Sequence, residues 1–100
     1  MNAIVDLHGA PGSQNGDDDS GCSGPILWPE PANVNRTIYD LGLIAKQVVE
    51  LNQQPATLNV VSGIELLNEP NTTVVCCVCT VCCEVMSGDR RADRLRFHCF

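Results

Sequence analysis

The sequence is short of basic residues. It has six Lys and Arg against twelve Asp and Glu, which gives a formal net charge of −6 at pH 7. Binding to a phosphate backbone requires clustered Lys and Arg side chains. We therefore expect no nucleic-acid partner.

Long apolar runs and a targeting segment are also missing. The most apolar window, TVVCCVCTVCCEV at residues 73–85, is shorter than the roughly 20 residues that a membrane-spanning helix needs. The first residues, MNAIVDLHGA, have neither the basic start nor the long apolar stretch of a signal peptide. The sequence thus predicts no membrane partner and no signal peptide.

Two compositions meet near residue 70. Before this point nine acidic residues stand against Arg36 and Lys46, and after it three acidic residues stand against four arginines. The first part has Cys22 as its single cysteine, whereas the second part has six: Cys76, Cys77, Cys79, Cys82, Cys83 and Cys99. We therefore treat residues 1–70 and 71–100 as separate regions.

The first region begins with a predicted strand and a long loop. AIVDL at residues 3–7 is typical of a short buried strand. Residues 8–25 are rich in Gly, Pro, Asn, Asp and Ser and predict a loop. Loops beyond about 12 to 15 residues without structure of their own are usually functional or disordered, so its length is informative.

A helix and a second strand are predicted next. Apolar residues at helical spacing predict a helix from about Val34 to Leu51, with Asn33 or Asn35 as its cap. TLNVVSGIELL at residues 57–67 is typical of a strand in a parallel sheet that is covered on both faces. The order of strand, helix and strand predicts an α/β fold with a right-handed parallel crossover.

Polar side chains follow both predicted strands. His8 comes directly after the first strand, and Asn68 and Glu69 come directly after the second. In parallel α/β folds the functional groups lie at the carboxyl ends of the strands. We expect these three residues to share one rim of the sheet, with Asp6 supporting the end of the first strand.

Four segments carry a family resemblance. They resemble the fungal exo-β-1,3-glucanases of glycoside hydrolase family 5, and they are DLHGAPGSQNG (6–16), DSG (19–21), NVNRTIYDLGLIAK (33–46) and GIELLNEP (63–70). The resemblance implies a (β/α)8 TIM barrel, of which this chain matches the third strand, third helix and fourth strand. Because such a barrel takes about 250 residues, residues 1–70 are predicted to be a barrel fragment.

The resemblance also implies roles for individual residues. Glu69 matches the general acid/base, Asn68 a neighbour that binds the sugar 2-hydroxyl, and His8 a histidine of the −1 subsite. The family retains anomeric configuration by using two carboxylates, and the nucleophile has no counterpart here. The implied partner is β-glucan or another β-glucoside, with no metal or other cofactor, and the parent enzyme would be extracellular or in the cell wall. We expect this chain itself to be inactive.

Part of the family pattern is altered. After SQNG the family commonly has an aromatic residue and then Asp-Asn-Ser-Gly, whereas this chain has DDDSG at residues 17–21. Asp19 stands at the amide position near the −1 sugar, and it is our fourth candidate for substrate binding. The acidic run is not an EF-hand, because Ser20 and Ile26 stand where that loop needs Gly and Glu. Trp28 could stack on a sugar or pack beneath the loop.

The cysteine-rich region supports a competing hypothesis. Cys79 and Cys82 form a CxxC, and residues 76–83 hold enough thiolates for a metal site or a redox function. No second CxxC or HxxxH follows at a finger-like distance, and the β-branched residues between the cysteines are typical of a strand. Residues 71–100 are therefore predicted to be a Cys-rich and then basic tail, unrelated to the barrel and not a native domain.

Overall fold

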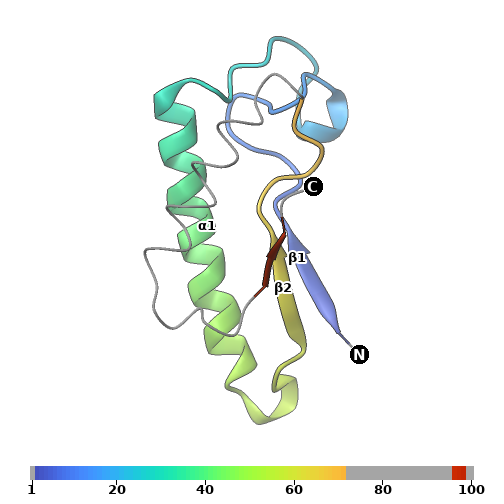
Figure 1. Ribbon diagram of the computed structural model, residues 1–100, viewed down its shortest axis with the longest axis vertical. Coiled ribbons are helices and arrows are strands. Elements are labelled where there is room, and N and C mark those ends of the chain that lie inside the picture. The colour runs from blue at the N-terminus through green and yellow to red at the C-terminus, as the bar shows by residue number, and fades with distance from the viewer. Residues whose placement is uncertain (1, 72–95, 99–100) are drawn as a thin grey trace.

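The computed structural model describes residues 2–71 and 96–98. The elements are β1 (Ala3–Asp6), the 3₁₀ helix η1 (Asp18–Ser20), α1 (Pro31–Asn52), the 3₁₀ helix η2 (Pro55–Thr57), β2 (Val61–Glu65) and β3 (Arg96–His98). The strands form one sheet in the order β1-β2-β3, with β2 parallel to both neighbours. Helix α1 runs beside the sheet and connects β1 to β2 (Figure 1). The predicted parallel β–α–β unit is confirmed.

Strands β1 and β2 are shorter than the sequence predicts. Their register pairs Ile4 with Gly63 and Val5 with Ile64. The second predicted strand loses its first residues to η2 and to a turn in which Asn59 has a φ of 55°. Asn tolerates this left-handed conformation better than most residues, which is why the chain can turn sharply here.

The predicted cap of the helix is wrong. Helix α1 begins at Pro31 with Glu30 at the cap position, and no side chain caps it. Pro at the first helical position loses no hydrogen bond and has a preset φ, so the helix extends three residues beyond the predicted start. The Asn33 side chain instead bonds to the loop before the helix, where its Nδ2 donates to the Leu27 carbonyl at 2.9 Å.

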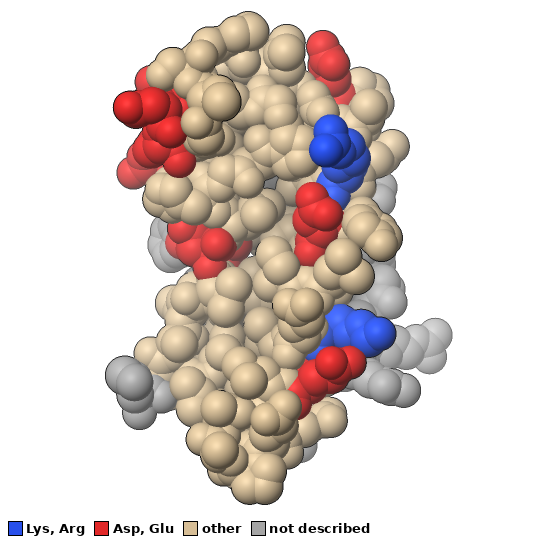
Figure 2. Space-filling model, turned by 180° about the vertical axis from the view of Figure 1, so that it is seen from behind, with Lys and Arg blue, Asp and Glu red and all other residues tan. Residues whose placement is uncertain are grey.

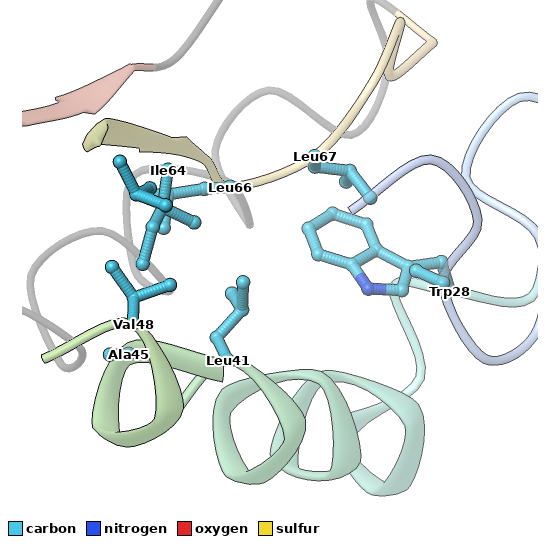
Figure 3. Packing of buried hydrophobic residues seen from close by; sticks show 9 residues of the cluster. Trp28, Leu41, Ala45, Val48, Ile64, Leu66 and Leu67 are labelled. Atoms are coloured by element: carbon cyan, nitrogen blue, oxygen red, sulfur yellow. The ribbon is translucent and has the colours of Figure 1, made fainter. Parts of the chain in front are cut away.

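One apolar layer joins the helix to the sheet. Leu41, Ala45 and Val48 of α1 are buried against residues of β2 and of the segment that follows it (Figure 3). These helical positions belong to the apolar stripe that the sequence predicts. The buried members of the cluster are Ala10, Trp28, Leu41, Ala45, Val48, Val61, Ile64, Leu66 and Leu67. Burial of each large aliphatic side chain stabilises the fold by about 1.5–3 kcal/mol.

Trp28 packs within this core. It is 0% exposed, and its indole N–H donates to Thr37 Oγ1 at 2.8 Å. Figure 3 shows the indole facing Leu67 above the start of α1. Of the two possibilities for Trp28, the structure supports packing and excludes stacking on a sugar.

The second region enters the sheet through β3. Its register pairs Gly63 with Arg96 and Glu65 with His98, a pairing that the sequence did not predict. The strand predicted around the cysteines and the site at residues 76–83 lie outside the described residues. Within the part of the chain that the structure describes, no helix combines the length and apolarity needed to cross a membrane.

Candidate functional site

The candidate site lies at the carboxyl ends of β1 and β2. Backbone pairing continues beyond both strands, because Leu7 N–H donates to Glu65 O and Asn68 N–H donates to Leu7 O, each at 3.1 Å. His8 and Glu69 therefore come directly after the two residues, Leu7 and Asn68, that this last hydrogen bond joins. The segments that follow β1 and β2 meet at this end of the molecule (Figure 1).

His8 is held by the end of β1. Its Nδ1 lies 2.8 Å from Asp6 Oδ2, with the two side chains 60% and 31% exposed. The hydrogen bond to Asp6 raises the pKa of His8 above 6.5, and the charges of Asp6, Asp19 and Glu69 act in the same direction against a lowering by desolvation. Asp6 thus holds His8, a contact that the sequence did not predict, and Asp19 and Glu69 are close enough to influence the charge of His8.

Asn68 and Glu69 mark the change from core to surface. Leu66 and Leu67 are 0% and 2% exposed, Asn68 is half-buried and Glu69 is exposed. The buried leucines anchor the segment, so the backbone of Glu69 is held at the surface directly beside the core.

The backbone at Glu69 is unusual. Its φ is 40°, in the left-handed region that glycine favours. Such conformations persist only where the surrounding structure imposes them, and they cluster at functional sites. Residue 69 is also followed by Pro70, which restricts the preceding backbone further. The backbone at Glu69 is therefore held by the structure around it.

Asp19 is placed by the loop after β1. It belongs to η1, and its Oδ1 accepts a 3.4 Å hydrogen bond from Asn15 Nδ2. The next residue, Ser20, is buried and donates through its hydroxyl to Asp17 O at 2.9 Å, while its Oγ lies 2.6 Å from Ser13 Oγ. These bonds hold η1 against the loop, so Asp19 is presented from a structured turn.

Gln14 is a buried residue of the site that the sequence did not single out. It is 0% exposed, and its carboxamide contacts the backbone on both sides of the rim. A glutamine between Ser13 and Asn15, in a loop of polar residues, is expected to face solvent. The resemblance includes this position within SQNG, but nothing in its residue type signals burial.

Charge is distributed unevenly over the described surface. Figure 2 shows acidic side chains gathered on the side of η1, and basic side chains that alternate with further acidic ones along the opposite edge of that view. The Lys and Arg side chains that the structure describes, Arg36 and Lys46, both belong to α1. The candidate site therefore offers carboxylates, an amide and one imidazole as its polar groups.

Metal chemistry has no candidate site in residues 2–71. Among the described residues, no three His, Cys, Asp or Glu side chains are arranged to hold an ion. Cys22 is exposed and free. The cysteines of the competing hypothesis, at residues 76–83, lie outside the described residues.

The relatives found by comparison with known proteins are glycosidases by name. No protein-family model matches the chain. Curated relatives are fungal and are named for hydrolysis of glucan. The chain is 42% identical over 71 residues to a probable glucan 1,3-beta-glucosidase A of Aspergillus fumigatus. It is 44% identical over 71 residues to the enzyme of the same name from Aspergillus niger, and 46% identical over 70 residues to a glucan 1,3-beta-glucosidase of Blumeria graminis.

The similarity covers most of this chain and little of its relatives. It includes 70–71% of the chain and only 15–16% of each relative. The chain is therefore similar to a short part of a glucan 1,3-beta-glucosidase, which confirms the glucanase resemblance at this level.

Proposed function

We propose that residues 1–70 are the part of a retaining exo-β-1,3-glucosidase of glycoside hydrolase family 5 that carries the general acid/base, Glu69. The observation that supports the proposal is the parallel β–α–β unit, which brings Asn68 and Glu69 beside His8. The Asn68 N–H donates to the carbonyl of Leu7, the residue before His8. Relatives named glucan 1,3-beta-glucosidase support the substrate class. The parent enzyme would act on β-glucan outside the cell or in the cell wall.

Each residue has a task in this mechanism. Glu69 would protonate the glycosidic oxygen as the leaving sugar departs and then deprotonate the attacking water. Asn68 would donate to the sugar 2-hydroxyl, and His8 would contact the sugar in the −1 subsite. Asp19 would accept a hydrogen bond from a sugar hydroxyl, because an ionised carboxylate cannot donate one.

An exposed apolar side chain on the sheet, that of Ile4, supports a partial barrel. Val5 and Ile64 are opposite one another in the register, and Ile64 is buried in the core beneath α1. Side chains alternate along a strand, so Ile4 lies on the other face, where it is 55% exposed. In a (β/α)8 barrel that face is filled by the side chains of neighbouring strands.

The proposal is tested by restoring the rest of the barrel. Residues 1–70 replace the matching segment of the Blumeria graminis relative, and hydrolysis of laminarin is measured. We expect glucose release by the chimera and a loss of about 10²–10⁴-fold for Glu69→Gln, because proton transfer to the leaving oxygen is removed. Glu50→Gln, the same change on the exposed surface of α1, should leave hydrolysis unchanged.

A second substrate tests retention. An aryl β-glucoside with a good leaving group needs little protonation, so Glu69→Gln should still form the glycosyl-enzyme intermediate. Azide needs no deprotonation and should restore turnover by forming β-glucosyl azide. A folded chimera whose Glu69→Gln variant hydrolyses laminarin at the unsubstituted rate would refute the proposal.

A further inference from the structure

The side chain of Gln14 joins the two loops of the candidate site. Its Oε1 accepts the Ala10 N–H at 3.0 Å, and its Nε2 donates to His8 O at 2.8 Å and to Asn68 O at 3.0 Å. The residue is 0% exposed. One buried carboxamide thus bonds to the segment after β1 and to the segment after β2.

The chemistry of these partners fixes the orientation of the amide. A carboxamide has two N–H donors and one carbonyl oxygen. Here two backbone carbonyls face the nitrogen and one backbone N–H faces the oxygen. The reversed orientation would place oxygen against the carbonyls of His8 and Asn68, and it would leave these two carbonyls and the Ala10 N–H without partners.

Gln14 also bonds to the backbone on both sides of Glu69. The carbonyl before Glu69, that of Asn68, is bonded to the Gln14 side chain. Two residues after Glu69, the Asn71 N–H donates to the Gln14 backbone carbonyl at 3.1 Å. The left-handed φ of 40° at Glu69 therefore lies between two bonds to the same residue. Strain of this kind has to be held by neighbouring structure, and Gln14 supplies that restraint.

We propose that Gln14 is a positioning residue that fixes the carboxylate of Glu69 relative to the imidazole of His8. It touches neither substrate nor the reacting atoms; it acts through the backbone of His8, Asn68 and Asn71. Its importance for hydrolysis rests on the proposed function, whereas the geometry that it imposes can be measured without any hydrolysis.

The test measures electrostatic coupling between His8 and Glu69 by NMR titration of the His8 ring in the 100-residue chain. Among the described residues, Asp6, Asp19 and Glu69 are charged groups that act on this ring. In the unsubstituted chain, Glu69→Gln should lower the pKa of His8. In a Gln14→Met background the two groups lose their fixed separation, and Glu69→Gln should then leave the pKa of His8 unchanged.

A matched control separates positioning from general stability. The side chain of Asn52 makes a similar pair of hydrogen bonds to the backbone at the opposite end of β2. It donates to Val61 O at 2.8 Å and accepts from Val61 N–H at 3.0 Å. Asn52→Leu should lower stability and keep the coupling. If Gln14→Met keeps the coupling as well, Gln14 is merely structural and the proposal fails.

A measurement on the unsubstituted chain covers the case in which Gln14→Met does not fold. The side-chain amide protons of Gln14 should exchange with solvent at least about tenfold more slowly than those of the exposed Gln53, because Gln14 is buried and its Nε2 donates to the carbonyls of His8 and Asn68. Equal exchange rates for the two glutamines would overturn the proposal.

If the electrostatic coupling between His8 and Glu69 depends on Gln14 and the chimera does not hydrolyse laminarin, the proposed function fails and the positioning role of Gln14 stands.

Discussion

At the scale of single residues, Asp6 and His8 form a pair whose strength depends on pH. The Asp6 carboxylate lies 2.8 Å from His8 Nδ1 and is the largest cause of the raised pKa of His8. A group with a raised pKa in the folded state stabilises the fold when it is protonated. The contribution is fully present below about pH 6.5 and disappears as pH rises through the pKa of the folded state.

The Asp6→Asn variant tests this pair. An amide has no charge, so the pKa of His8 should fall toward its ordinary value, as NMR titration of the ring would show. Urea unfolding at about pH 5.5 and about pH 8.5 should show a loss of stability with rising pH that is smaller in the variant.

Asp18→Asn is the matched control, because Asp18 is exposed and is not among the groups that act on His8. Its His8 titration should equal that of the unsubstituted chain. A pKa of His8 that stays raised in Asp6→Asn would assign the shift to the other carboxylates.

At the scale of secondary-structure elements, Trp28 ties the loop to α1. Its indole N–H donates to Thr37 Oγ1, and Thr37 donates to Asn33 O at 2.9 Å. The hydroxyl therefore links the buried indole to the first turns of the helix. The long loop is held near the site through this contact in addition to the bonds of Gln14.

Thr37→Val should destabilise the fold by about 1–3 kcal/mol, because the buried indole N–H loses its acceptor while the shape of the side chain is kept. Unfolding in urea, followed by Trp28 fluorescence, gives the difference. Thr57→Val is the control. Its hydroxyl also donates to a backbone carbonyl, that of Leu51, but in an exposed setting, so a change within about 0.5 kcal/mol is expected. Equal losses in both variants would contradict this account.

At the scale of the whole molecule, one β–α–β unit cannot by itself build the proposed active site. Retaining hydrolysis needs a second carboxylate about 5–5.5 Å from the first. The resemblance assigns the nucleophile to a strand late in the barrel, outside the residues that the resemblance covers. Glu69 would supply the acid/base function alone.

We therefore expect the purified 100-residue chain to release no glucose from laminarin, while the chimera with a complete barrel does. The measurement is an enzymatic glucose assay over long incubation, with the chimera as positive control. Hydrolysis by the chain alone that disappears in Glu69→Gln would show that a second catalytic group is present.

The sequence alone determined β1, α1 and β2 and their order. Helical spacing of apolar residues predicted α1, two apolar runs predicted β1 and β2, and their order required parallel pairing. It also predicted that His8, Asn68 and Glu69 follow the strands, because a residue after a strand's last apolar position must lie at its carboxyl end. The altered limits of β2 and α1 arose from a turn at Asn59 and from Pro31, where local backbone preferences outweighed the hydrophobic pattern.

Tertiary structure decided which polar residues are buried and which act on each other. Gln14 and Trp28 are both 0% exposed, yet one stands in a polar loop and the other between turn residues. Their burial depends on partners far along the chain, such as Asn68 for Gln14. Hydrogen bonds between distant segments leave no periodic signal in a sequence, because the spacing of the partners is set by the fold and not by any helix or strand repeat.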